Sequence, residues 1–231
     1  MRTIKFPKIL SLIFLALFFT QFSLEAQTYG KNGMVVSDNI LASEVGIEIL
    51  KKGGNAIDAS IATAFALAVT HPEAGNIGGG GFIVLMKSDG EVTTFDFREK
   101  APLKANPDLF LDSDGKLIEG YNHETIKAVG VPGTVAGLYL AHQKYGSLPW
   151  AELVQPAVEL AEKGFPMTWG LYQVALRMSE MDDSFDIMKN YFRNDEGSVV
   201  QPGEIWKQPA LSYTLSLIRD KGHDGFYRGE V

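Results

Sequence analysis

The chain has 231 residues, with 21 Lys and Arg against 28 Asp and Glu, so its formal net charge is −7. An apolar fraction of 45% with 11% aromatic residues predicts a globular protein with a sizeable core and excludes a disordered chain. The chain has no cysteine, which excludes a disulfide framework, a thiolate nucleophile and a Cys-based metal site. The acidic balance argues against nucleic acid as a partner, because its phosphates favour clusters of Lys and Arg.

The first 26 residues have the pattern of a secretory signal peptide. Basic residues precede an almost wholly apolar stretch, residues 9–24, and Ala26 then offers a small side chain for cleavage. We therefore expect cleavage near Ala26 and export of residues 27–231 to the periplasm or the outside of the cell. The alternative is a retained membrane anchor, which is less favoured because a spanning helix needs ~20 apolar residues.

A short strand and two helices are predicted next. Val-Val at 35–36 predicts the strand. Ser-Asp-Asn at 37–39 offers side-chain oxygens that can cap a helix, and Gly-Gly at 53–54 stops it. Residues 56–69 are apolar nearly all round, which predicts a buried helix rather than an amphipathic one.

A β-hairpin is predicted after these helices. Residues 82–86 form a continuous apolar strand, Ser-Asp-Gly at 88–90 is a turn signal, and residues 92–98 form the return strand. The return strand alternates, which places Phe95 and Phe97 on one face and polar side chains on the other.

A loop and further helices are predicted for the rest of the chain. The segment 102–120 is rich in turn residues and is expected to be the loop. Helices are expected, in chain order, over residues 133–146, 150–163, 168–181 and 211–221. Pro156 is expected to interrupt the second of them. Because no repeat or linker is found, the pattern predicts one α+β unit.

The chain shows no motif for a nucleotide, a metal or a catalytic nucleophile. The glycine run at 78–81 lacks the spacing of a phosphate cradle, and instead predicts a backbone packed too closely for any Cβ atom, or several residues at positive φ. The four histidines lack the spacing of a zinc site, and Asp-Ser-Asp-Gly at 112–115 lacks the rest of a calcium loop. No G-x-S-x-G elbow occurs. We therefore expect no cofactor, no metal and no catalytic residue in this chain.

Arg98 is the polar residue that most suggests a ligand. A guanidinium at the end of a strand, beside aromatic side chains, can hold a carboxylate with two parallel hydrogen bonds. The alternative is a structural ion pair with Asp96 on the same face, or with a carboxylate elsewhere.

Several segments together resemble the gamma-glutamyltransferase family, whose members are also called gamma-glutamyl transpeptidases or glutathione hydrolases. The matching blocks are A-S-x-x-G-x-x-I-L-x-x-G-G-N-A-x-D-A at 42–59, Gly-Gly-Gly-Gly-Phe at 78–82, Phe-Arg-Glu-Lys-Ala-Pro at 97–102, Val-Pro-Gly-Thr-Val-Ala-Gly at 131–137, Gln-Pro-Ala at 155–157, Pro-Ala-Leu at 209–211 and Gly-Phe-Tyr-Arg-Gly at 225–229. Each block alone is weak, but their order and spacing are specific.

The resemblance implies part of an N-terminal-nucleophile hydrolase fold, an αββα sandwich. In this family a zymogen cleaves itself into a large and a small subunit, and the new N-terminal Thr of the small subunit is the nucleophile. Its α-amine, with a pKa of about 7.7–8.0, can act as the base for its own hydroxyl. A gamma-glutamyl-enzyme ester forms from glutathione or a related compound, and water or an acceptor amino acid or peptide resolves it.

The resemblance covers only the first part of the large subunit. The family's nucleophilic Thr follows the Phe-Tyr-Arg-Gly block, so residues 27–231 are expected to be inactive alone and to need the small subunit from the same precursor. The family's Arg that binds the α-carboxylate of the gamma-glutamyl group maps onto Arg98. The alternatives are a related acylase or capsule poly-gamma-glutamate transferase, or an exported binding module without enzymatic activity.

Overall fold

The computed structural model describes residues 29–181, 190–194 and 196–231. The chain divides into two compact units, Met1–Met34 and Val35–Val231, and the second is described below. The predicted signal segment, residues 1–26, lies outside the described residues. Among those that are described, no helix has both the length and the apolar character needed to cross a bilayer.

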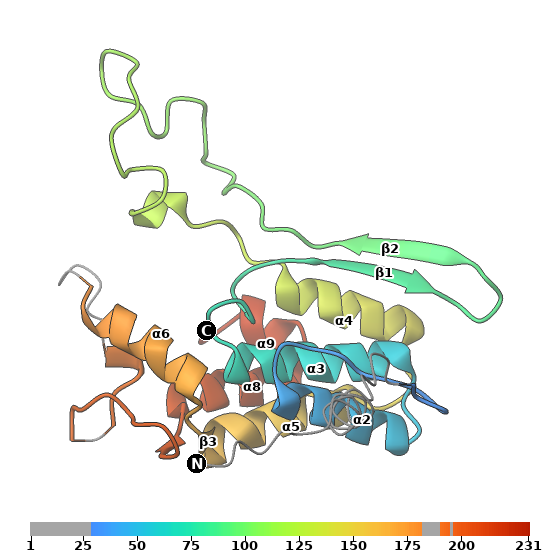
Figure 1. Ribbon diagram of the computed structural model, residues 1–231. Coiled ribbons are helices and arrows are strands. Elements are labelled where there is room, and N and C mark those ends of the chain that lie inside the picture. Colours follow the sequence, from blue (N-terminus) through green and yellow to red (C-terminus); the bar gives the residue numbers. More distant parts are fainter. Residues whose placement is uncertain (1–28, 182–189, 195) are drawn as a thin grey trace, which may run out of the picture. The chain divides into compact units, whose positions relative to one another are not determined.

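Helices make up most of the regular secondary structure described in the second unit, and a hairpin and a long loop accompany them (Figure 1). The helices are α2 (Ile40–Lys51), α3 (Ala56–Thr70), α4 (Thr134–Tyr145), α5 (Trp150–Lys163), α6 (Trp169–Ser179), α8 (Pro209–Lys221) and α9 (Asp224–Tyr227), with a 3-10 turn η1 (Ile126–Ala128). The strands are β1 (Phe82–Met86), β2 (Val92–Asp96), β3 (Phe165–Pro166) and β4 (Ile205–Trp206). The unit is therefore α+β, as predicted.

Helix α3 lies at the centre of the helical part. It packs against α2, α4 and α5, and α5 packs in turn against α8. The Asn55 side chain accepts hydrogen bonds from the N–H groups of Ile57 and Asp58, and Asp58 accepts one from the Asn55 N–H, which forms a capping box. Most of α3 is buried, which confirms the prediction of a buried helix.

Two local predictions are wrong. Residues 35–36 form no strand, because no neighbouring backbone pairs with them in the part of the chain that is described. Helix α5 continues through Pro156 without interruption. Proline removes one backbone hydrogen bond there, but Leu153, Val154 and Ala157 around it are fully buried against the core, and this packing holds the helix together.

Strands β1 and β2 form an antiparallel hairpin in which Phe82 is paired with Asp96 and Met86 with Val92. The turn places Gly90 at a φ of 86°, a conformation that favours glycine. One face of the hairpin lies toward the helices, where the Phe95 ring meets Tyr145 edge to face at 6.0 Å. The return strand ends at Asp96 rather than at residue 98.

The outer face of the hairpin carries large apolar side chains in solvent. They are Phe82, Val84, Met86 and Val92, of which Val84 is 74% exposed. The continuous apolar character of β1 therefore marks a strand with two apolar faces, of which the helices cover one.

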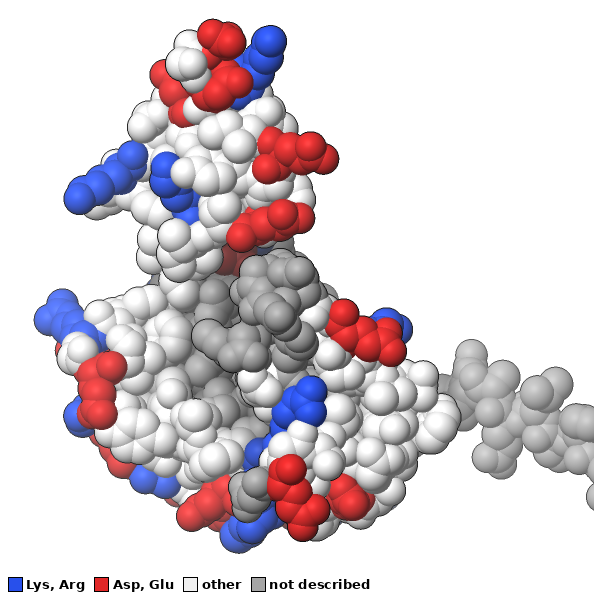
Figure 2. Space-filling model, turned by 90° about the vertical axis from the view of Figure 1, so that its left-hand side faces the viewer, with Lys and Arg blue, Asp and Glu red and all other residues white. Residues whose placement is uncertain are grey.

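Residues 101–130, called the arm below, connect the hairpin to α4. Lys100 and Val131 close its base with two antiparallel backbone hydrogen bonds of 3.2 and 2.8 Å. Figure 1 shows the arm reaching away from the helices, and Figure 2 shows acidic side chains at its far end and down one side. The Asp112 carboxylate accepts hydrogen bonds from the N–H groups of Asp114 and Lys116, so residues 112–115 form a turn, as predicted.

Candidate substrate-binding site

Four of the sequence blocks meet at the amino end of α4. They are the glycine run 78–81, the Phe-Arg-Glu segment 97–99, the Val-Pro-Gly-Thr segment 131–134, and Tyr227 in α9. Hydrogen bonds and close backbone contacts connect them. The segment that carries Arg98 is held between the glycine run and the amino end of α4.

Close backbone packing explains the glycines of this site. A Cβ atom on Gly80 would lie 2.7 Å from the Phe97 carbonyl oxygen and 2.8 Å from the Arg98 Cα. A Cβ atom on Gly133 would collide with the same carbonyl oxygen. The four glycines at 78–81 all have φ outside the positive range, which rules out the second predicted explanation. Close packing explains Gly79, Gly80 and Gly81, whereas a Cβ atom on Gly78 would meet no neighbour within 4 Å.

Gly79 and the nearby Asn76 side chain bind the hydrogen-bond donors at the amino end of α4. The Gly79 carbonyl accepts hydrogen bonds from the N–H groups of Gly133 (2.7 Å) and Thr134 (3.0 Å). The Asn76 side-chain oxygen accepts from the Gly79 N–H (2.8 Å) and from the Thr134 hydroxyl (2.6 Å). These bonds take up donors that a helix otherwise leaves unpaired at its start.

Tyr227 holds the same helix end from the side of α9. Its hydroxyl donates to the Pro132 carbonyl at 2.9 Å and accepts from the Ala136 N–H at 3.3 Å. Burial raises the pKa of the Tyr227 hydroxyl, so it stays protonated and able to donate at neutral pH. Sequence reasoning placed this residue in a family block but did not find this role.

Arg98 presents its guanidinium to solvent from this rigid base. The backbone N–H of Arg98 donates to the Asp96 carboxylate at 3.0 Å, so Asp96 fixes the main chain of Arg98. The side chain is 66% exposed, with its Nε 3.4 Å from a Glu99 oxygen and its Cζ 6.0 Å from the centre of the Phe82 ring. Arg98 forms no ion pair with the Asp96 side chain, but it forms one with Glu99, which is the other form of the structural alternative. Because the guanidinium remains 66% exposed, it can also bind a carboxylate.

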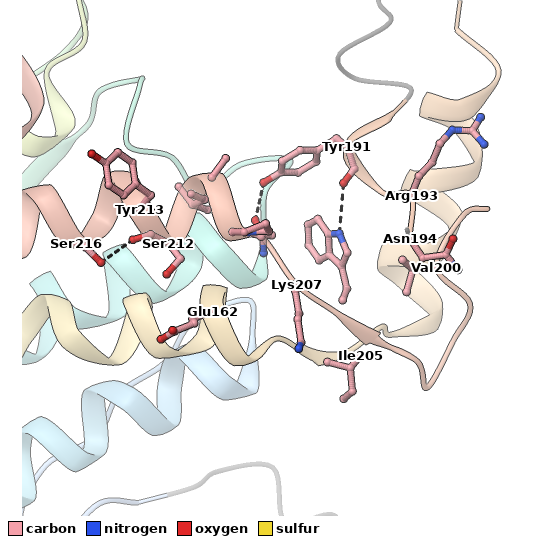
Figure 3. A pocket seen from close by; sticks show the side chains of 15 residues that line it. Glu162, Tyr191, Arg193, Asn194, Val200, Ile205, Lys207, Ser212, Tyr213 and Ser216 are labelled. Atoms are coloured by element: carbon pink, nitrogen blue, oxygen red, sulfur yellow. Dashed lines mark hydrogen bonds between the residues drawn. The ribbon is translucent and has the colours of Figure 1, made fainter. Parts of the chain in front are cut away.

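A separate cavity of about 770 Å³ lies at the start of α8 (Figure 3). The Tyr191 hydroxyl donates to the Gln208 side-chain oxygen at 2.5 Å, and the Gln208 amide donates to the Val69 carbonyl at 2.9 Å. Burial raises the pKa of Tyr191 to about 12. These polar groups bind one another and hold the segment around residue 191 against the core, so we assign the cavity no ligand.

Three of the four histidines have structural surroundings, and the fourth, His123, is exposed on the surface. The His142 ring hydrogen-bonds the Leu148 carbonyl at 2.8 Å, and the His223 ring stacks on Tyr227 with ring centres 4.5 Å apart. His71 is the C-cap of α3. In the described ranges, no group of three or more His, Asp or Glu side chains is placed to hold a metal ion.

The fold and this site define the class of protein. The family model described as gamma-glutamyltranspeptidase matches residues 42–231, and the chain belongs to that family. It is 45% identical over 216 residues to the glutathione hydrolase proenzyme of Pseudomonas sp. (strain A14), an alignment that covers 94% of this chain.

Solved structures of two related proteins have the same fold over part of their length. The gamma-glutamyltranspeptidase of Helicobacter pylori superposes with a TM-score of 0.84 at 42% identity, over 89% of this chain and 59% of that one. The cephalosporin acylase of Bacillus halodurans gives a TM-score of 0.76 at 31% identity, over 87% of this chain and 38% of that one. The chain spans 38% of the length of the Pseudomonas relative.

Proposed function

We propose that this chain is the amino-terminal part of the large subunit of an exported gamma-glutamyltransferase precursor. The complete protein would cleave the gamma-glutamyl amide of glutathione and related compounds. Support comes from the family membership, from relatives named glutathione hydrolase proenzymes, and from the N-terminal pattern of a signal peptide. The observation that carries the proposal is Arg98, whose exposed guanidinium is held at the point where the family blocks converge.

Arg98 would bind the α-carboxylate of the gamma-glutamyl group. Two charge-assisted hydrogen bonds to a planar carboxylate set both the position and the direction of the substrate, which places its γ-carbonyl for attack. The Asp96 carboxylate and the glycine contacts keep the Arg98 main chain still while the side chain binds.

The acyl transfer itself would use groups in the part of the relatives that this chain does not cover. The threonine hydroxyl of the small subunit would attack the γ-carbonyl while its α-amine takes the hydroxyl proton. The α-amine would then pass that proton to the amide nitrogen, so that cysteinylglycine leaves as a neutral amine and the gamma-glutamyl ester forms. Water or an acceptor amine then attacks the resulting ester and releases the gamma-glutamyl group. No cofactor enters this scheme.

The outer face of the hairpin would receive further strands or helices from the same precursor. Its four large apolar side chains are exposed in the described chain, and two strands alone form a marginal sheet. Monomeric proteins rarely leave a contiguous apolar face of this kind in water. A small subunit from the same precursor is the partner that the family membership supports.

The test compares two proteins with a chromogenic gamma-glutamyl anilide as the donor. The processed precursor that contains this chain should release the aniline, whereas residues 27–231 alone should not exceed the buffer rate. Turnover by the chain alone, or none by the processed precursor, would contradict the proposal.

The related acylase is the second candidate, because the Bacillus halodurans cephalosporin acylase has the same fold over this region. A glutaryl anilide keeps the carboxylate that Arg98 would bind but lacks the α-amine of a gamma-glutamyl donor. Preference of the processed precursor for the glutaryl compound would indicate the acylase, and preference for the gamma-glutamyl compound would indicate the transferase.

A further inference from the structure

Thr134 connects the two segments that enclose the Arg98 main chain. It is the first residue of α4 and is 6% exposed. Its hydroxyl donates to the Asn76 side-chain oxygen at 2.6 Å, and its N–H donates to the Gly79 carbonyl at 3.0 Å. The same Asn76 oxygen accepts the Gly79 N–H, so one buried hydroxyl completes a closed set of bonds between residues far apart in the chain.

This set of bonds determines the spacing between the glycine run and α4. Gly80 follows Gly79 directly, and Gly133 directly precedes Thr134. Both glycines contact the backbone at Phe97 and Arg98 so closely that neither has room for a Cβ atom. Any increase in the distance between Gly79 and Thr134 therefore loosens the slot in which the Arg98 main chain lies.

A binding arginine is sensitive to such a change because bidentate recognition depends on direction as well as distance. The Arg98 side chain is mostly exposed, so few contacts along its length correct a shift of its Cα. The position of the guanidinium is then set chiefly by the main chain and by the contacts of its tip with Glu99 and Phe82.

We propose that Thr134 is a positioning residue for substrate binding, which acts on Arg98 through the glycine run. The inference rests on the proposed function, since it assumes that Arg98 holds the α-carboxylate. Thr134 touches no substrate in this scheme. Its hydroxyl keeps the Arg98 slot closed, and the carboxylate site forms only while the bond to Asn76 is made.

The test uses Thr134→Val and Thr134→Ser in the processed precursor. Valine keeps the shape and removes the hydroxyl, whereas serine keeps the hydroxyl. We expect Thr134→Val to raise the KM for a gamma-glutamyl anilide by about threefold to tenfold, the size expected for the loss of one hydrogen bond. We expect kcat within twofold of wild type, and Thr134→Ser close to wild type in both constants.

A second donor separates positioning from general damage to the fold. The 4-aminobutyryl anilide has no α-carboxylate and cannot use Arg98. For Thr134→Val, we expect kcat/KM for the 4-aminobutyryl donor to stay unchanged while kcat/KM for the gamma-glutamyl donor falls. The ratio of the gamma-glutamyl value to the 4-aminobutyryl value should therefore fall by the same factor as the gamma-glutamyl value itself. Ser212→Ala is the matched control, since it removes another buried hydroxyl, bonded to the Val158 carbonyl at 3.3 Å, and should leave the ratio unchanged.

If Thr134→Val does not mature, Asn76→Ala removes the same bond from its more exposed partner, together with the bond from the Gly79 N–H, and should give at least the same loss of ratio. Equal losses for both donors, or no rise in KM, would overturn the positioning role.

The failure of this proposal can be distinguished from the failure of the proposed function. If Arg98→Lys also leaves the ratio unchanged, the proposed role of Arg98 is wrong. If Arg98→Lys lowers the ratio while Thr134→Val does not, only the role of Thr134 is wrong.

Discussion

Helix α3 and strand β1 are both almost wholly apolar, yet the rest of the described chain buries them to different extents. Helices α2, α4 and α5 enclose α3, and residues such as Ile61 and Phe65 are fully buried. Strand β1 has helices on one face only, and Val84 on the other is 74% exposed. Equal hydrophobicity therefore leads to a finished core in one region and to an open face in the other.

The difference shows which part of the described chain covers its own apolar surface. The helical part pairs its buried carboxylate as well as burying its apolar side chains: Asp58, fully buried, accepts hydrogen bonds from the Asn55 N–H and from both the N–H and the hydroxyl of Ser147. The hairpin leaves apolar surface uncovered. Arg98 lies at the boundary, with a main chain fixed by packing and a side chain open to solvent.

The largest effect on stability is expected when a core substitution in the helical part is compared with one on the outer face of the hairpin. In the isolated chain, Leu153→Ala should lower the free energy of unfolding by about 2–5 kcal/mol, because it leaves a cavity in a closed core. Val84→Ala should change it by less than about 0.5 kcal/mol, because its side chain is already in water. Urea unfolding followed by tryptophan fluorescence measures both.

The same Val84→Ala change in the processed precursor gives the control. If a further layer covers the hairpin there, the substitution should lower the free energy of unfolding by about 1–2 kcal/mol, the transfer cost of two buried methyl groups. An equal, small effect in both proteins would mean that the outer face stays open.

Arg98→Lys is expected to have the next largest effect. Lysine keeps the charge but loses the planar fork, so one of two parallel bonds to the α-carboxylate is lost. A bond to a charged group contributes roughly 1.5–3 kcal/mol, which lowers kcat/KM for gamma-glutamyl donors about tenfold to a hundredfold or more. Steady-state kinetics on the processed precursor measures this, and self-cleavage should change much less. A kcat/KM within twofold of wild type would make Arg98 a structural residue.

Tyr227→Phe should have a smaller effect, on stability. The change removes only the hydroxyl that connects Pro132 and Ala136. Loss of these bonds should lower the free energy of unfolding by about 0.5–1.5 kcal/mol. Tyr213→Phe removes an exposed hydroxyl bonded to Glu230 and serves as the control, with no measurable change expected. Thermal or urea unfolding of the three proteins decides between these outcomes, and equal stability of all three would contradict the prediction.

Thr63→Val should have the smallest effect, and it should stabilise the chain. The Thr63 hydroxyl is buried in α3 and has no hydrogen-bond partner among the described residues. Valine has nearly the same shape and no polar group to desolvate, so a gain of up to about 1 kcal/mol is expected. A loss of stability in urea unfolding would show that the hydroxyl is satisfied in solution.

Local sequence determined the elements whose signals lie within a few residues of each other. Capping by Asn39 and Asn55 set the starts of α2 and α3, Gly90 set the hairpin turn, and Pro209 set the first turn of α8. Each of these signals uses hydrogen bonds or dihedral angles inside one turn, so it can be read without knowing the fold.

Tertiary structure decided the outcomes that depend on distant neighbours. The burial of α5 kept it helical through Pro156, and the lack of a pairing strand left residues 35–36 irregular. The family blocks identified Arg98, but they did not reveal that Asp96 binds its backbone N–H. The bond between Asn76 and Thr134 spans 58 residues, and the bond between Tyr227 and Pro132 spans 95. Such contacts form only when the chain has folded, because their partners share no local pattern along the sequence.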